Sequence, residues 1–267
     1  MNDFITTITE LIKHTDMPIL KALPAGQGCK EAGFGEYVFQ NNWLGIKKHG
    51  KHKWDYGKTG EVINGVPVNN LQLKFCIYDT MQECLDDYVS ILSGSRYQRV
   101  RDSKSFQEAA YYIKVCGYAT SLTYWQSLIN DYIIPLNFGD LDYSMPFKSS
   151  MTKNFKWEET FGSVRLPTGQ EFRRAVEPPV ELWENITRVA GILQKIRDTF
   201  DNAIVVNSWY RTKEFNAGTS GASAKSNHLK ALAVDIRPTW TWNYTHVFNE
   251  IKKVFGLTGY SWYPFLV

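Results

Sequence analysis

Apolar residues recur at helical spacing in four segments of the first 135 residues. The predicted helices cover residues 3–14, 80–93, 105–116 and 123–134. In the second of them, Asp79 or Thr80 is placed to cap the first turn. The third stops at Gly117 and the fourth before Pro135, two residue types that commonly end helices. This part of the chain is therefore expected to be mainly helical.

One stretch between these helices has the alternation of a β-hairpin. Residues 61–77 alternate polar and apolar side chains around Asn64-Gly65, a dipeptide that favours a tight two-residue turn. We expect a small β lobe inserted into the helical domain.

The pattern changes after Pro135. Residues 136–168 show no periodicity and are rich in Pro, Gly, Asn, Ser and Asp, which predicts a linker or an extended edge segment. Beyond it we expect helices at residues 182–200 and 244–255 and strands at residues 203–207 and 233–237. Helix and strand mix there without a βαβ rhythm, so the fold class is α+β. The expected order is a mainly helical domain at 1–135, a linker at 136–168 and an α+β domain at 169–267.

Composition narrows the function classes. The chain has 267 residues, of which 43% are hydrophobic, enough for two domains with their own cores. No apolar run approaches the roughly 20 residues that span a bilayer, and the first 20 residues lack the features of a secretory signal. The net charge of +3 is too small to indicate a nucleic-acid partner. We therefore expect neither a nucleic-acid nor a membrane partner.

The cysteines and one basic cluster also bear on function. The four cysteines form no CxxC pair, so buried free thiols are expected rather than a thiolate zinc site; they are Cys29, Cys76, Cys84 and Cys116. The basic cluster runs from Lys47 to Lys53 and includes His49 and His52. A solvated loop is one interpretation, and attraction to an anionic polymer such as a cell wall is the other.

Two glutamates of the first half are placed where a glycosidase needs carboxyl groups. Hydrolysis of a glycosidic bond requires an acid beside the bridging oxygen and usually a second group for the water or the developing cation. Glu31 follows a predicted helix and precedes a Gly-x-Gly turn at Gly33 and Gly35, which lets a substrate approach closely. Glu61 precedes the Asn-Gly turn. Taken alone, each is an ordinary solvated glutamate.

The surrounding motifs resemble the glucosaminidase family, endo-β-N-acetylglucosaminidases with a lysozyme-like fold. AGQGCKEAGFGEY followed by QNNWLGIK is similar to that family's AQAALESGWG followed by NNLFGIK. The later segments KTGEVINGVPV, FCIYDT and VCGYATSLTYWQSLI match further family motifs in order. The resemblance covers about residues 15–134, and it departs from the family at Ala32, Phe34 and Cys76, which bears on fine specificity.

This resemblance implies roles for six residues. Glu31 would be the general acid and Glu61 the second carboxylate, while Tyr118 would line the cleft beside the scissile sugar. Residues expected to bind substrate are Gln27, Asn42 and Tyr124. No cofactor is implied for this domain. Whether the reaction retains or inverts depends on the separation of the two carboxylates.

In the second half, His228 and Asp235 stand seven residues apart around a loop that enters a strand. A lone histidine is more often structural. However, NSWYRTKEFNAGTSGASAKSNHLKALAVDIRP resembles the D-alanyl-D-alanine carboxypeptidase-like zinc peptidases, whose pattern runs SGYRS..yN, GGA and SxHxxGxAxD. The resemblance covers about residues 170–267. It implies zinc held by His228 and Asp235, with Arg211 near a substrate carbonyl or carboxylate.

The third zinc ligand of that family lies in a His-x-Asp pair on its last strand. GYSWYPFLV is similar to the run into that pair, and Val267 is the last residue given. His246 does not match the pattern, and Ala231 stands where the family has glycine. Two expectations follow: either the sequence is cut just before its final ligand, or the domain is a degenerate relative that binds zinc weakly.

Together the two resemblances predict a peptidoglycan hydrolase. The first domain would cleave β-1,4 glycosidic bonds of the glycan strand, and the second would cleave or bind stem peptides. We expect a phage tail or virion protein acting on the host wall, with peptidoglycan and other phage tail proteins as partners. The alternatives are a cytoplasmic phage endolysin and a structural or wall-binding virion module with a degenerate peptidase domain.

Overall fold

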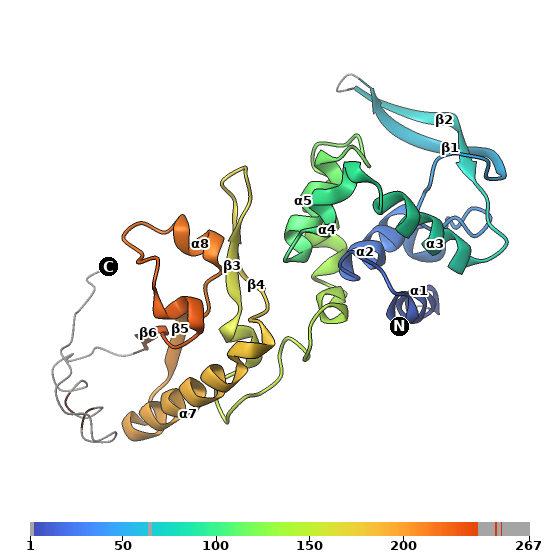
Figure 1. Ribbon diagram of the computed structural model, residues 1–267. Coiled ribbons are helices and arrows are strands. Elements are labelled where there is room, and N and C mark those ends of the chain that lie inside the picture. The colour runs from blue at the N-terminus through green and yellow to red at the C-terminus, as the bar shows by residue number, and fades with distance from the viewer. Residues whose placement is uncertain (1–2, 64–65, 240–248, 250–251, 253–267) are drawn as a thin grey trace. The chain divides into compact units, whose positions relative to one another are not determined.

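The computed structural model describes residues 3–63, 66–239, 249 and 252 (Figure 1). The chain divides into two units. Unit 1 comprises Met1–Phe147 and Val164–Val176, and unit 2 comprises Lys148–Ser163 and Glu177–Val267. Each unit mixes helices with a small antiparallel pair of strands, so the α+β class expected from the sequence is confirmed.

Unit 1 is mainly helical, as its apolar periodicity predicts. Its α-helices are α1 (Asp3–His14), α2 (Ala22–Glu31), α3 (Met81–Leu92), α4 (Gln98–Arg101), α5 (Phe106–Val115) and α6 (Tyr124–Ser127). The predicted cap is supplied by Thr80, whose hydroxyl accepts from the Glu83 amide at 3.2 Å, and Ser105 caps α5 in the same way by accepting from the Glu108 amide at 3.3 Å. Helix α5 ends before Gly117, which has a φ of 78°.

Helix α2 is the centre of unit 1. Eight consecutive residues, Ala22–Cys29, are buried, although an ordinary surface helix buries only one face. Two glycines allow its neighbours to come close: a Cβ on Gly26 would lie 2.6 Å from Ile133, and one on Gly28 would lie 2.4 Å from the ring of Trp43. The Asp142 carboxylate accepts from the backbone amide of Ala22 at 2.9 Å and so caps the first turn from a distant part of the chain.

The helix predicted at 123–134 is divided in two. After α6 the chain continues as a π-helix, η3 (Leu128–Ile133), a form that is rare and usually confined to one turn. Both Leu128 and Ile133 are fully buried and lie where a side chain on Gly26 would be. The wider turn therefore accompanies the close approach of this segment to α2.

The β lobe is a hairpin of β1 (Trp54–Ile63) and β2 (Val66–Cys76). The strands pair antiparallel from Trp54 opposite Cys76, with an irregularity between Thr59 and Glu61. The hairpin is confirmed and is longer than the alternation indicated, while its Asn-Gly turn lies outside the described residues. At its base, the Cys76 amide donates to the Ile46 carbonyl at 3.0 Å, which joins the strands to the loop before them.

Unit 2 is built on one long helix, α7 (Trp183–Phe200), whose apolar face is buried as predicted. Strands β5 (Ile204–Ser208) and β6 (Asp235–Pro238) pair antiparallel, with Ser208 opposite Asp235. A short helix, α8 (Lys213–Ala217), follows β5. The two strands expected at 203–207 and 233–237 are thus present, whereas the helix expected at 244–255 falls largely outside the described residues.

The segment 136–168, expected to be a linker, contains short elements and contributes to both units. A 3₁₀ turn (Trp157–Thr160) precedes β3 (Gly162–Arg165), which pairs with β4 (Glu171–Val176).

The four cysteines are free thiols, and only Cys116 is partly exposed. Across the described residues, no helix has both the length and the apolar character needed to cross a bilayer.

The glycine packing of α2 yields a stability prediction. Gly28→Ala should lower the stability of unit 1 by about 1–3 kcal/mol, because the new methyl group overlaps the buried indole of Trp43. Gly191→Ala in α7 is the matched control, since no atom lies within 4 Å of the added Cβ. It should stabilise unit 2 by about 0.5–1 kcal/mol through helix propensity. Thermal unfolding followed by circular dichroism measures both changes, and a Gly28→Ala protein as stable as the parent would contradict this account of the packing.

Candidate functional site

Glu31 is the last residue of α2 and its side chain is exposed. The chain leaves the helix through three residues with positive φ: Gly33 at 54°, Phe34 at 57° and Gly35 at 98°. A Cβ on Gly33 or Gly35 would collide with the ring of Tyr37 or Phe4, respectively. The Gly-x-Gly turn therefore reverses the chain in little space and leaves the glutamate at the surface, as the sequence indicated.

A second turn lies against the Glu31 carboxylate. Gly45 has a φ of 65°, and a Cβ there would sit 3.3 Å from Glu31 Oε2. Asn42 shapes this turn, because its side-chain amide donates to the carbonyls of Ile46 and Cys76, both at 2.8 Å, and its oxygen accepts from the Ile46 amide at 2.9 Å. Asn42 is buried and its hydrogen bonds are internal. This geometry favours a positioning role for Asn42 over the substrate contact expected from the sequence.

A chain of hydrogen bonds runs from the core to Glu31. The Tyr88 hydroxyl donates to Gln27 Oε1, Gln27 Nε2 donates to the Tyr124 hydroxyl at 2.9 Å, and that hydroxyl donates to Glu31 Oε1 at 2.9 Å. We call these four residues the Glu31 relay. Gln27 and Tyr88 have no solvent exposure, and Tyr124 has 4%. Tyr124 thus contacts the carboxylate directly and Gln27 contacts it through Tyr124, while the substrate contacts expected of both stay a prediction.

The electrostatics of the relay favour this direction of donation. Burial, and then the nearby negative charge of Glu31, raise the pKa of Tyr124 well above its ordinary value. Its hydroxyl consequently keeps its proton and remains a donor to the carboxylate. Burial likewise raises the pKa of Tyr118, whose hydroxyl donates to the Leu44 carbonyl at 2.9 Å. Tyr118 thus tethers the turn that carries Gly45.

Glu61 is located only by its backbone. It lies in β1 opposite Val68, directly after the strand irregularity, and its side chain is not among the described ones. Its role as the second carboxylate stays a prediction.

The predicted residues of unit 2 lie together. His228 Nε2 is 3.4 Å from Asp235 Oδ1, and an Arg211 guanidinium nitrogen donates to Asp235 Oδ2 at 2.7 Å. Strand pairing places Asp235 opposite Ser208, whose hydroxyl accepts from Arg211 Nε at 3.2 Å. Burial acts to raise the pKa of Asp235, but the hydrogen bonds and charges of His228 and Arg211 outweigh it and lower that pKa. The carboxylate is thus held in its charged form.

The donor set of unit 2 fits a zinc ion. His228 Nδ1 lies 2.6 Å from the carbonyl oxygen of Trp209, which can only accept, so Nδ1 carries a proton. Nε2 is therefore the ring nitrogen that faces Asp235, and it is the one that would bind a metal ion held between the two side chains. His228 and Asp235 would supply two ligands, and the part of the chain from which the resemblance draws a third lies outside the described residues.

Two contributors were not identified from the sequence. Tyr88 lies in the helix predicted at 80–93, and a hydroxyl among apolar residues at helical spacing was the only signal that it needs a buried partner. The Trp209 carbonyl is backbone, and no residue pattern identifies it.

Two protein-family models match the chain. Residues 10–134 match the family described as mannosyl-glycoprotein endo-beta-N-acetylglucosaminidase, and residues 155–263 match the peptidase M15 family. The peptidoglycan hydrolase FlgJ of Escherichia coli, from strains O157:H7 and K12, is 30% identical over 114 residues. That match covers 39% of this chain and 36% of the relatives, so the chain spans about a third of their length.

Matches to solved structures cover about half of this chain. The catalytic domain of the autolysin Auto from Listeria monocytogenes is 23% identical, with a TM-score of 0.44, over 52% of this chain and 86% of that one. A C-terminally truncated glycoside hydrolase domain of FlgJ from Salmonella typhimurium is 24% identical, with a TM-score of 0.41, over 51% and 97%. The two family models confirm both resemblances read from the sequence: residues 10–134 match the glucosaminidase family and residues 155–263 match the peptidase M15 family, each over less than half of the chain.

Proposed function

We propose that residues 10–134 hydrolyse β-1,4 glycosidic bonds of peptidoglycan, with Glu31 as the general acid. The observation that carries this proposal is an exposed carboxyl group held by a fully buried hydrogen-bond chain. The family match, and relatives named as peptidoglycan hydrolases, support the substrate class.

The surroundings of Glu31 suit proton donation. The residue stands at the C-terminal end of α2, where the helix dipole opposes a negative charge. When its proton passes to the glycosidic oxygen, the carboxylate that forms keeps the hydrogen bond from Tyr124, which stabilises that charge. The second carboxylate would come from Glu61 on the hairpin, to position water or to stabilise the developing cation.

Unit 2 would act on the stem peptides of the same polymer. A zinc ion held by His228 and Asp235 would supply a Lewis acid and an activated water for amide hydrolysis. The Arg211 guanidinium, beside Asp235 at 2.7 Å, would orient that carboxylate and meet a substrate carbonyl or carboxylate. Binding of stem peptides without cleavage is the alternative for this domain.

The pairing of a glycan-cutting and a peptide-cutting domain in one chain suits local opening of a cell wall. We infer a phage tail or virion setting from that pairing, with other tail proteins as partners; a phage endolysin is the alternative. Mass spectrometry of purified virions would find the chain in the particle in the first case and only in the lysate in the second.

Glu31→Gln should abolish glycan cleavage while leaving the fold intact. The amide keeps the size of the side chain but has no proton to give, so the rate should fall by about 10²- to 10⁴-fold. Turbidity loss of purified cell walls, with mass analysis of the released sugar ends, measures the activity. The matched control is Glu36→Gln, an exposed glutamate five residues away, which should remain fully active. Wall cleavage by Glu31→Gln at the parent rate would disprove the assignment.

Tyr124→Phe should slow cleavage by less than the loss of Glu31. It removes one hydrogen bond to a charged group, worth about 1.5–3 kcal/mol, or about 10- to 100-fold in rate. Because Tyr124 is buried, the loss should appear in kcat with little change in KM, measured on a soluble glycan fragment. An increase in KM alone would indicate that Tyr124 binds substrate, as the sequence first suggested. The control Tyr37→Phe changes an exposed hydroxyl and should leave both constants unchanged.

A further inference from the structure

A buried carboxylate lies on the side of α3 that faces the base of the hairpin. Asp87 is 8% exposed and accepts from three side chains. His49 Nε2 and the Tyr78 hydroxyl lie 2.8 Å and 2.6 Å from Oδ2, and His52 Nε2 lies 3.4 Å from Oδ1. The two imidazole rings are 4.8 Å apart. The loop that carries them was expected from its composition either to be solvated or to attract an anionic polymer.

A thiol completes the group. Cys76 ends β2 and has no solvent exposure. Ligand atoms of His49, Cys76 and Asp87 all lie within 4.8 Å of one another. One imidazole, one thiol and one carboxyl group thus lie close together, although they come from the 47–53 loop, from β2 and from α3. His52 is outside this close group and contacts only Asp87 Oδ1, at 3.4 Å, so its ring would have to turn to supply a fourth ligand.

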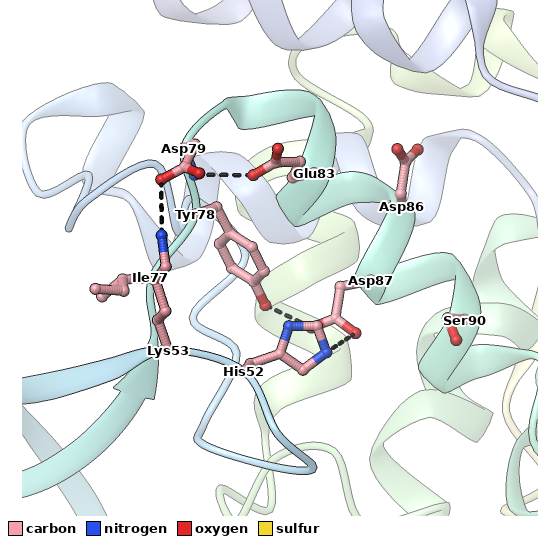
Figure 2. Close-up of a pocket in the computed structure, with 9 residues that line it drawn as sticks. All are labelled: His52, Lys53, Ile77, Tyr78, Asp79, Glu83, Asp86, Asp87 and Ser90. Atoms are coloured by element: carbon pink, nitrogen blue, oxygen red, sulfur yellow. Dashed lines mark hydrogen bonds and ion pairs between the residues drawn. The ribbon is translucent and has the colours of Figure 1, made fainter.

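The group is reachable from solvent. A cavity of about 460 Å³ is lined by His52, Tyr78 and Asp87, with Lys53, Asp79 and Glu83 at its far side. Figure 2 shows the His52 ring and the Tyr78 hydroxyl both directed at the Asp87 carboxylate. An ion therefore has a path to the Asp87 carboxylate and to His52.

We propose that His49, His52, Cys76 and Asp87 form a structural zinc site in unit 1. Nitrogen and sulfur donors select a borderline ion such as Zn²⁺ over Mg²⁺ or Ca²⁺, which prefer all-oxygen sites. In a tetrahedron with bonds of about 2.0–2.1 Å, neighbouring ligand atoms are about 3.3 Å apart. His49 Nε2 lies 2.8 Å from Asp87 Oδ2, which is shorter than that edge, and His52 Nε2 lies 3.4 Å from the other oxygen, Oδ1. An ion bound by one carboxylate oxygen would therefore require both rings to turn.

The surroundings supply the supporting contact that such sites need. The Tyr78 hydroxyl donates to Asp87 Oδ2 and fixes the orientation of the carboxylate, which is the usual arrangement around a metal-bound carboxylate. On binding, the Cys76 thiol releases its proton to solvent and becomes a thiolate ligand. Four protein ligands leave no open position, so this ion would be structural rather than catalytic.

The site would join three segments at one point. The 47–53 loop leads into β1, Cys76 ends β2, and Asp87 lies in the middle of α3. Zinc would therefore fix the base of the hairpin that carries Glu61 to the helical part of unit 1. This role is independent of the glycosidase proposal, since none of its ligands belongs to the Glu31 relay.

Cobalt substitution of the full-length chain tests the proposal. Co²⁺ bound to a thiolate gives a charge-transfer absorption in the near ultraviolet, and all four cysteines lie in the first half of the sequence. A metal at His228 and Asp235 cannot produce that band. We expect one equivalent of Co²⁺ to give the band, one equivalent of Zn²⁺ to remove it, and Cys76→Ser to abolish it. Cys84→Ser, which changes another fully buried thiol, is the control and should keep it.

Two further variants guard against misfolding as the explanation. His49→Ala changes a side chain that is 38% exposed and should weaken Co²⁺ binding at least tenfold with an unchanged circular dichroism spectrum. Tyr78→Phe should weaken it by about 10- to 100-fold, as loss of a supporting hydrogen bond does elsewhere. The proposal is overturned if the parent chain gives no thiolate band, if the band survives Cys76→Ser, or if His49→Ala binds Co²⁺ as tightly as the parent. In that case the cluster is only a set of ion pairs around Asp87.

Discussion

The structure of unit 1 depends on the burial of α2. A helix enclosed on all sides must have partners for every polar group it carries inward, because an unsatisfied buried amide costs about 1–3 kcal/mol. Gln27 is that group, and both ends of its amide are satisfied by Tyr88 and Tyr124. Tyr124, which bonds Gln27, also bonds the Glu31 carboxylate and so fixes its position. The hydrogen bonds that satisfy the buried helix therefore also position the carboxyl group. Gly26 and Gly28 make this possible because they let neighbouring side chains pack closely against α2.

Local patterns predicted the longer helices and the hairpin, but not α4, α8 or the β3–β4 pair. The capping hydroxyls of Thr80 and Ser105, the stop at Gly117 and the Asn-Gly signal of the hairpin each act over a few residues, so the sequence displays them directly. The same holds for the Gly-x-Gly turn after Glu31, whose positive φ values glycine adopts without strain. The division of the last predicted helix into α6 and a π-turn was not visible, because its cause is packing against a glycine about 100 residues earlier.

The functions of individual side chains were harder to predict than their positions. Gln27 stands in a family motif, and substrate binding was the natural interpretation of a polar residue beside a catalytic one. Its actual partners lie 61 and 97 residues away in the sequence, and no local pattern reports them. The histidines of the basic loop pose the same difficulty. Composition indicates solvation, whereas a single buried aspartate on α3 gives both of them a partner.

Two ways of orienting a charged group recur in this chain. In unit 2 the backbone carbonyl of Trp209 accepts from His228 Nδ1, so Nε2 is the ring nitrogen that faces Asp235. In unit 1 side-chain hydroxyls orient the carboxyl groups, with Tyr124 bonded to Glu31 and Tyr78 bonded to Asp87. A hydroxyl can be removed by one substitution to phenylalanine without changing the shape of the core, whereas a carbonyl cannot. Substitution can therefore separate the contribution of orientation from that of packing in unit 1, whereas in unit 2 no side-chain substitution removes the orienting carbonyl.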